Sequence, residues 1–248
     1  MRRVLLTLEY EGTRFAGWQR QINGPSVQEE VERALLKVVK SRVSVTGASR
    51  TDAGVHALGQ HAHFDTGCGI PDDKWPFVLN ALLPRDIRVT RSLSVGDTLH
   101  ARFSAREKEY EYRILNRRFP SALRRDFTAF VPLTLSVTLM EEALVDLPGR
   151  HDFKAFQAAG GSAKTTVRTL RKADLFREGD ELVLSVTGDA FLYNMVRIIA
   201  GTLIAVGSGR LGPDAFSRAI QTGDRLCLGP TASACGLTLM RVEYEGLV

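Results

Sequence analysis

The segment from Ala48 to Ala57 is the strongest candidate for a catalytic site, because a cation, a hydroxyl and a carboxylate follow one another in it. These groups belong to Arg50, Thr51 and Asp52, and the neighbouring residues are small. Small neighbours allow a flat ligand to approach the backbone closely. An aspartate in such a loop can act as a base or a nucleophile, but aspartate is also a common turn residue. The segment therefore predicts either a catalytic carboxylate at Asp52 or an ordinary turn.

Two glycine-rich patterns resemble nucleotide-binding loops but fail in detail. Residues 207–212 have the glycine spacing of a dinucleotide site, yet they follow an expected helix instead of a strand. Residues 160–165 resemble a phosphate-binding loop, but alanines occupy positions 158 and 163, where that loop needs glycine. Contact of this second loop with an RNA backbone stays possible. The sequence predicts no nucleotide cofactor.

His61, His63 and Asp65 alternate along one expected strand and have the side chains that could ligate a metal. No further cysteine or histidine has a spacing that would complete such a site, so we favour a half-exposed strand. The zinc deaminase signature also fails, because no Pro-Cys-x-x-Cys occurs. The three cysteines are odd in number and lack C-x-x-C spacing, which predicts a reducing cytoplasm rather than a disulfide framework. We expect neither a metal nor another cofactor.

The charge of the chain is compatible with a nucleic-acid partner. The 248 residues include 33 Lys and Arg against 28 Asp and Glu, a net charge of +5, and 26 of the basic residues are Arg. Arginine suits phosphate contacts better than lysine does. The charges form no basic tail, so a polyanion would bind across a folded surface. The longest apolar runs are too short for a membrane span, and Glu9 interrupts the N-terminal apolar run, which favours a strand over a signal peptide.

Hydrophobic periodicity predicts an α+β protein with two similar halves, 1–105 and 106–248, of which the first carries the Asp52 loop. Ser26 and Glu29 form a capping box at the start of a helix. Hairpin signals, such as the one at 178–180, outnumber regular β-α alternation and favour mixed or antiparallel sheets flanked by helices. The expected strands are 4–10, 43–46, 61–65, 87–95, 99–105, 110–115, 167–176, 182–187 and 237–244, and the expected helices are 26–40, 72–83, 137–147, 191–206 and 213–222.

Five blocks of residues follow one another along nearly the whole chain: Tyr10–Gly12 with Gly17–Gln21, Arg50–Ala57, His100–Ala105 with Tyr110–Tyr112, Phe191–Arg197, and Gly236–Leu239. Together these blocks resemble the tRNA pseudouridine synthase A (TruA) family. Ser49 and Ile198 depart from residues that are common in that family, glycine and asparagine respectively. The resemblance implies a pseudouridine synthase fold with a cleft between the halves.

The resemblance also implies roles for individual residues. Asp52 corresponds to the catalytic aspartate, and Tyr110 corresponds to a tyrosine that stacks on the uracil ring and helps to remove its C5 proton. Arg197 is the implied cation that keeps the carboxylate ionised, which burial alone would oppose. Arg50 and Arg102 are the implied RNA contacts, with Arg50 helping to hold the target nucleotide out of the base stack. Tyr112 lies on the same strand face as Tyr110, so one of the two tyrosines is expected to be structural.

The implied function is cofactor-free isomerisation of uridine to pseudouridine at tRNA positions 38, 39 and 40, in the anticodon stem-loop, by a cytoplasmic homodimer. Three alternatives stay open: a synthase of another RNA site, a non-catalytic RNA-binding protein of the same fold, and a glycosidic hydrolase. A hydrolase ordinarily needs a second carboxylate as the acid, and none with that role is evident in the blocks.

Overall fold

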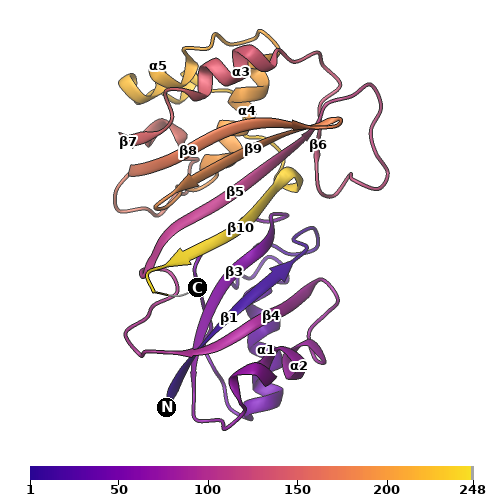
Figure 1. Ribbon diagram of the computed structural model, residues 1–248, viewed down its shortest axis with the longest axis vertical. Coiled ribbons are helices and arrows are strands. Elements are labelled where there is room, and N and C mark those ends of the chain that lie inside the picture. Colours follow the sequence, from indigo (N-terminus) through magenta and orange to yellow (C-terminus); the bar gives the residue numbers. More distant parts are fainter. Residues whose placement is uncertain (247–248) are drawn as a thin grey trace. The chain divides into compact units, whose positions relative to one another are not determined.

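The computed structural model describes residues 1–246, which form two compact units (Figure 1). Unit 1 contains residues 1–106 together with the described residues from Thr238 onward, and unit 2 contains Glu107–Leu237. The division after residue 106 lies next to the expected boundary at 105. The last strand differs from the expectation, because Thr238 pairs with His56 and groups with unit 1. The sequence gives no signal for pairing between strands so distant along the chain.

Unit 1 is built on a mixed sheet with the strand order β4-β1-β3-β10. β1 pairs antiparallel with both β3 and β4, whereas β10 pairs parallel with β3. The strand expected at 43–46 is reduced to the short β2, which pairs with β3. The bounds are β1 (Arg2–Tyr10), β2 (Thr46–Gly47), β3 (His56–Thr66), β4 (Ile87–Val95) and β10 (Leu237–Tyr244).

Two helices, α1 (Val27–Val39) and α2 (Trp75–Asn80), pack together in unit 1 (Figure 1). The expected N-cap is confirmed, because the Ser26 hydroxyl accepts a hydrogen bond from the backbone N–H of Glu29 at 3.3 Å. α2 is shorter than the expected helix over 72–83. It follows the 3₁₀ turn η1 (Asp72–Lys74), and it ends at Asn80, whose side chain makes two hydrogen bonds to the backbone of Val89.

Unit 2 is built on a sheet with the order β5-β9-β8-β7, in which all of these neighbours are antiparallel, and the short β6 adds parallel to β5. The expected hairpin is confirmed: β8 and β9 are joined at Gly179, whose φ of 59° lies in the left-handed region that favours glycine. All eight residues of β9 are buried. The bounds are β5 (Ala105–Leu115), β6 (Ala129–Phe130), β7 (Gly149–Asp152), β8 (Val167–Glu178) and β9 (Glu181–Gly188).

The helices of unit 2 are α3 (Val137–Leu144), α4 (Met195–Gly207) and α5 (Ala215–Thr222), with 3₁₀ turns η2 (Lys154–Phe156), η3 (Arg225–Cys227) and η4 (Ala234–Gly236). α4 begins four residues later than the expected helix over 191–206, because Asn194 adopts a left-handed conformation with φ of 60°. A Cβ atom on Gly201 of α4 would lie 1.8 Å from the carbonyl oxygen of Pro230. Glycine therefore allows the segment around Pro230 to cross α4 at close range.

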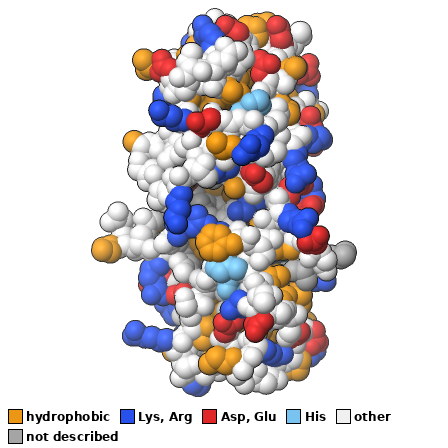
Figure 2. Space-filling view, turned by 90° about the vertical axis from the view of Figure 1, so that its left-hand side faces the viewer, with side chains coloured by type: hydrophobic (Ala, Val, Ile, Leu, Met, Phe, Trp, Pro, Cys, Tyr) orange, Lys and Arg blue, Asp and Glu red, His pale blue; other side chains and the backbone are white. Residues whose placement is uncertain are grey.

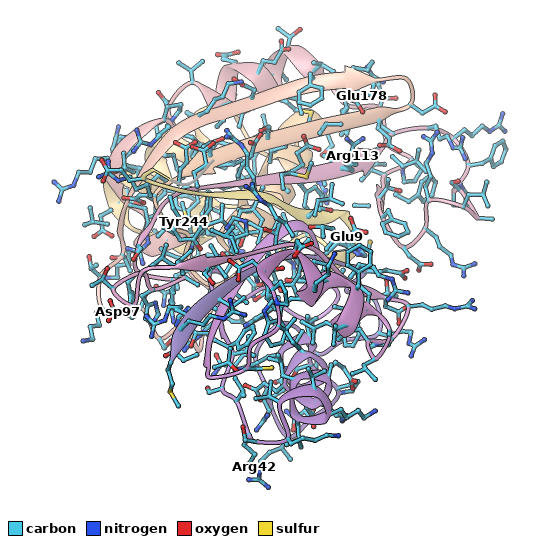
Figure 3. The ribbon with its side chains drawn as sticks, turned by 60° about the horizontal axis from the view of Figure 1, so that its bottom comes forward. Glu9, Arg42, Asp97, Arg113, Glu178 and Tyr244 are labelled. Carbon is cyan, nitrogen blue, oxygen red and sulfur yellow. The ribbon has the colours of Figure 1, made fainter. Side chains whose placement is uncertain are left out.

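Charged side chains stabilise the hairpin end of the unit 2 sheet, where Arg113 and Glu178 are labelled in Figure 3. The Arg113 guanidinium contacts Glu178 at 2.9 Å and the buried carboxylate of Glu181 at 3.0 Å. Burial disfavours its charge, but these hydrogen bonds outweigh burial and raise the pKa of Arg113. Elsewhere, blue Lys and Arg side chains are spread over much of the face shown in Figure 2, with red Asp and Glu side chains among them.

The predicted fold class, α+β with mixed and antiparallel sheets flanked by helices, is confirmed. The strand expected at 99–105 is wrong. Residues 100–104 form a turn closed by a hydrogen bond from the Ser104 N–H to the His100 carbonyl, and β5 begins only at Ala105. No helix within residues 1–246 has the length and apolar character needed to cross a membrane.

Candidate active site

Asp52 lies in a tight turn of unit 1 that connects β2 to β3. Its carbonyl oxygen accepts a hydrogen bond from the Val55 N–H at 3.1 Å, and its side chain is half-buried. The neighbouring Thr51 carbonyl accepts a hydrogen bond from the Trp18 N–H at 3.0 Å. Gly17 has φ of 104°, and a Cβ atom there would lie 2.5 Å from the Thr51 oxygen. The segment before α1 therefore packs directly against the Asp52 turn and requires glycine at position 17.

Gln60 of β3 fixes the strand that leads into this turn. Its side-chain oxygen accepts from the Ser49 N–H at 3.1 Å, and its side-chain nitrogen donates to the Ser49 carbonyl at 2.8 Å. The same nitrogen lies 3.4 Å from the Tyr10 hydroxyl, which shares a 2.7 Å hydrogen bond with the Thr51 hydroxyl. Gln60 is fully buried, so its amide supplies the hydrogen bonds that water would otherwise supply. The network holds the backbone on the N-terminal side of Asp52.

Substitution Gln60→Leu should lower both stability and turnover. Two buried backbone groups of Ser49 would lose their hydrogen bonds to Gln60, and we expect the free energy of unfolding to fall by about 2–4 kcal/mol. We also expect kcat to fall more than the affinity for RNA, because Asp52 would lose its fixed position. Urea denaturation and single-turnover kinetics measure the two effects.

Gln28→Leu is the matched control, because Gln28 also binds backbone groups of unit 1, the Arg20 N–H and the Val45 carbonyl, each at 2.9 Å. This variant should lose stability without losing kcat. An equal loss of kcat in both variants would contradict a positioning role for Gln60.

Arg50 and Arg102 both belong to unit 1, and both are exposed. They lie near enough for their charges to interact: burial, and then the charge of Arg50, lower the pKa of the Arg102 guanidinium. Neither guanidinium pairs with a carboxylate of the described residues. The structure thus brings together the two arginines expected to bind RNA, and Arg50 is two residues from Asp52.

The turn that carries Arg102, residues 100–104, is held from two sides. The buried His63 accepts a hydrogen bond from the Ala101 N–H at its Nδ1 atom, at 3.1 Å. The Tyr244 hydroxyl, on β10, donates to the Ala101 carbonyl at 2.7 Å (Figure 3 labels Tyr244). Both partners are far from residue 101 in sequence, so the periodicity of 99–105 could not reveal this turn.

Burial is the main reason that the pKa of His63 is lowered to about 4, with Arg3 and His100 lowering it further and Asp65 opposing them. An unfolded histidine titrates near pH 6.5. Between these values the unfolded chain binds a proton that the folded chain does not, so stability must fall as the pH decreases from about 6.5 to about 4. Above pH 6.5 this contribution is constant.

We expect His63→Gln to reduce the number of protons taken up on unfolding by about one. The free energy of unfolding should then depend less steeply on pH in this range. His61, whose pKa burial and then Arg91 also lower to about 4, keeps part of the sensitivity in the variant. Denaturation midpoints at several values between pH 7 and pH 5 give the two slopes. Equal slopes for the wild type and the variant would show that His63 does not carry this effect.

The possible metal ligands on β3 have other roles. His61 stacks on Tyr244, with ring centroids 5.3 Å apart, and Asp65 forms an ion pair with Arg3 at 2.7 Å. Together with the hydrogen bond of His63, these contacts use all three side chains of the pattern. Within residues 1–246, no group of three or more His, Cys, Asp or Glu side chains is arranged to hold a metal ion.

Tyr110 and Tyr112 lie on β5 in unit 2 and are both buried. The rings of Tyr110 and Phe191 pack edge to face, with centroids 5.0 Å apart. The Tyr112 hydroxyl donates to the Ser233 carbonyl at 2.9 Å, and burial raises its pKa to about 12. The hydroxyl of Tyr112 therefore has a structural partner. The assignment of Tyr110 as the tyrosine that acts on uracil stays a prediction.

Arg197 lies in the first turn of α4 and is half-buried. Its Nε atom donates to the Ala232 carbonyl at 2.8 Å, and one Nη donates to the Asn194 side chain at 2.7 Å. The Ala232 N–H in turn donates to the Arg197 carbonyl at 3.0 Å. The segment that crosses α4 at Gly201 therefore also fixes the direction of the Arg197 side chain.

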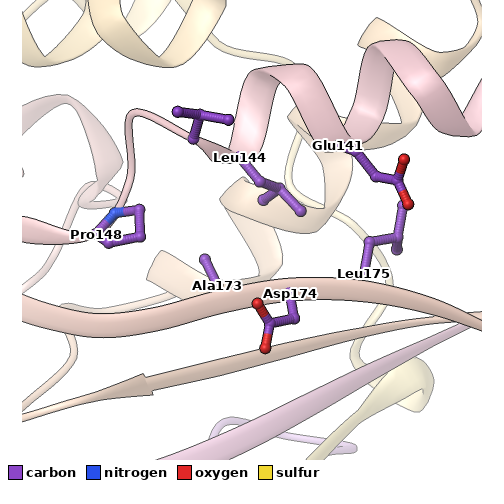
Figure 4. Close-up of a pocket in the computed structure, with 7 residues that line it drawn as sticks. Glu141, Leu144, Pro148, Ala173, Asp174 and Leu175 are labelled. Atoms are coloured by element: carbon purple, nitrogen blue, oxygen red, sulfur yellow. The ribbon is translucent and has the colours of Figure 1, made fainter.

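One pocket of unit 2 contains none of the expected site residues. It has a volume of about 400 Å³ and lies between α3 and β8 of unit 2, where Leu144 and Ala173 are two of its lining residues (Figure 4). A second pocket of about 250 Å³ is lined by Tyr112 and Ala232, beside the segment that binds Arg197. None of the five predicted site residues lines either pocket.

Sequence reasoning missed the residues that position the site: Gln60, His63 and Tyr244. Each acts through a hydrogen bond to the backbone of a segment distant in sequence, and such a bond leaves no spacing pattern. The alternation on β3 was the available signal, and it predicted a half-exposed strand in preference to a metal site, without indicating these hydrogen bonds.

Comparison with known proteins identifies the family. The sequence profile of the tRNA pseudouridine synthase family matches residues 7–104 and 143–245. Proteins named tRNA pseudouridine synthase A from Acetivibrio thermocellus and Ruminiclostridium cellulolyticum are each 46% identical to it, over 98% of this chain and 100% of the relative. The one from Bacillus licheniformis is 44% identical, over 98% of this chain and 99% of the relative.

Among solved structures, a Cbf5-Nop10-Gar1 complex matches 95% of this chain and 48% of that chain, at 13% identity and a TM-score of 0.40. That likeness is too distant to carry an argument, so the assignment rests on the sequence relatives. They confirm the resemblance carried by the Arg50–Ala57 block and its four companions: this chain belongs to the tRNA pseudouridine synthase A family.

Proposed function

We propose that this protein isomerises uridine to pseudouridine in transfer RNA, at positions 38, 39 and 40 of the anticodon stem-loop. The observation that supports this most strongly is full-length similarity to relatives named tRNA pseudouridine synthase A, over 98% of this chain. The anchoring of the Asp52 turn adds physical support. Tyr10, Thr51 and Gln60 form a buried network beside a carboxylate that is itself half-buried.

The reaction breaks the bond between uracil N1 and ribose C1′ and forms a bond between C5 and C1′. The proton at C5 is lost, and N1 gains one. No atom is added or removed and nothing is oxidised, so acid–base and nucleophilic groups of the protein are sufficient. The proposal therefore includes no cofactor.

Asp52 is the proposed essential carboxylate. It can attack the ring at C6, attack C1′, or remove a ribose proton to give a glycal-like intermediate, and each route starts from the ionised form. Arg197 is the proposed cation that favours ionisation. Tyr110 is proposed to stack on the uracil ring and to assist removal of the C5 proton.

Arg50 and Arg102 are proposed to bind the RNA near the target nucleotide. A uridine inside a helix cannot reach a protein carboxylate, so the nucleotide must leave the stack, and a guanidinium can replace part of the stacking that it loses. Action at three neighbouring positions favours recognition of tRNA shape over reading of individual bases. We further propose that the protein is a cytoplasmic homodimer and that one tRNA contacts both copies, which sedimentation with and without tRNA tests.

Release of tritium from tRNA labelled at uridine C5 tests the reaction. We expect release into water, with intact RNA and no free uracil. Free uracil would indicate a hydrolase. Tight binding of tRNA without release would indicate a non-catalytic binding protein, and release only from other positions would indicate a synthase of another site.

A further inference from the structure

Phe103 is a large aromatic side chain on the surface of unit 1, and 78% of it is exposed. A single exposed apolar residue is ordinary by itself. Phe103 differs because its ring stacks on the ring of His100, with centroids 4.4 Å apart and an interplanar angle of 30°. One face of the ring thus rests on the protein, while most of the side chain is accessible.

The backbone under this ring is rigidly held. The His100 Nδ1 atom accepts hydrogen bonds from the N–H groups of Arg102 and Phe103, at 3.2 and 3.3 Å. The His100 N–H donates to the Ser104 hydroxyl at 2.9 Å, and the rings of His100 and buried His63 pack edge to face, with centroids 5.0 Å apart. A ring that is already fixed loses little conformational entropy when a ligand binds to it.

One cation lies at this aromatic ring, and a second lies near the first. The Arg102 guanidinium carbon lies over the Phe103 ring, 5.8 Å from its centroid, and the charge of Arg50 interacts with that of Arg102. An accessible aromatic face next to unpaired guanidinium groups matches the alternation of base and phosphate in a single-stranded nucleic acid, in which bases stack on aromatic rings and phosphates bind cations. An apolar protein surface would complement the ring but not the adjacent positive charges.

We propose that the Phe103 ring is a stacking platform for an unpaired nucleobase of the RNA substrate, with Arg102 and Arg50 binding the phosphates next to that base. This inference rests on the proposed function in one respect, that the substrate is RNA. It gives Phe103 a binding role distinct from the chemistry of Asp52. His100 and His63 then become positioning residues, because they fix the ring without contacting the base.

Binding of a full tRNA transcript tests the proposal. We expect Phe103→Ala to raise the dissociation constant about 10-fold, and Phe103→Leu to do the same, because stacking needs a flat ring. Phe103→Trp should restore affinity to within about 3-fold of the wild type. Phe77→Ala is the matched control, since Phe77 is 72% exposed in the same unit, on α2, and should leave affinity unchanged.

The salt dependence separates stacking from charge. Phe103→Ala should leave the slope of log Kd against log salt unchanged, whereas Arg102→Ala should reduce it by about one. The Phe103→Trp variant adds a direct signal. Trp18 and Trp75 are buried, so quenching beyond that of the wild-type protein on addition of tRNA would report a base on the new indole.

Wild-type affinity in Phe103→Ala, restoration by leucine as well as by tryptophan, or an indole at position 103 that tRNA does not quench would each overturn the proposal. A change of oligomeric mass in Phe103→Ala would also overturn it, because the ring would then cover a protein contact. These outcomes are distinguishable from failure of the proposed function, in which wild-type protein would bind tRNA and release no tritium.

Discussion

Asp52→Asn should abolish isomerisation while leaving tRNA binding nearly intact. An amide has almost the shape of a carboxylate but cannot act as a nucleophile or accept the proton, so we expect single-turnover tritium release to fall by about 10⁴-fold or more. The backbone bonds of the turn, from Val55 to Asp52 and from Trp18 to Thr51, do not involve the carboxylate and should survive. The dissociation constant for tRNA should therefore change by less than about 3-fold.

Asp86→Asn is the matched control. Asp86 is another half-buried aspartate of unit 1, and its carboxylate forms a partly exposed ion pair with the Arg14 guanidinium at 3.3 Å. Such a pair contributes little to stability, so turnover should stay near that of the wild type. Near-normal turnover in Asp52→Asn, or an equal loss in Asp86→Asn, would remove the basis for assigning the chemistry to Asp52.

Tyr110→Phe has the second-largest expected effect. The variant keeps the ring and its edge contact with Phe191, but it loses the hydroxyl proposed to help remove the C5 proton. We expect tritium release to slow by about 10²- to 10⁴-fold, the usual range for loss of a positioned acid or base. Binding should be retained because the stacking surface is unchanged.

Tyr112→Phe serves as the comparison, since both tyrosines are buried on β5. Loss of the hydrogen bond from Tyr112 to Ser233 should cost about 1 kcal/mol of stability and leave tritium release close to the wild-type rate. If Tyr112→Phe were the slower enzyme, the assignment of the two tyrosines would have to be exchanged.

Local signals in the sequence were sufficient to predict those features of the structure that depend on neighbouring residues. Ser26 caps α1 through a bond to Glu29, three residues away, and Gly179 supplies the left-handed turn of the β8–β9 hairpin. The apolar stripe of α1 and the expected α+β class follow from the same short-range periodicity.

Features set by distant contacts were not predictable. Residues 100–104 alternate like a strand, but His63 and Tyr244 hold them as a turn. Likewise, β10 returns to β3 in unit 1, although its sequence follows the second half without a break. In both cases the deciding partner lies tens of residues or more away.

The same distinction applies to the residues of the candidate site. The residue types in the Arg50–Ala57 segment identified Asp52 as a candidate, and the family resemblance identified Tyr110 and Arg197. Gln60, which positions the Asp52 turn, lies within an ordinary strand and has no distinctive neighbours in sequence. Its role follows only from the two hydrogen bonds to Ser49.

The most direct test is a nucleoside balance on one tRNA transcript treated with the wild-type protein. Uridine lost and pseudouridine gained are counted separately at positions 38, 39 and 40. We predict that every uridine lost at these positions is replaced by one pseudouridine, with no strand break. Loss of uridine without an equal gain of pseudouridine, or pseudouridine found only elsewhere in the tRNA, would contradict the proposed function.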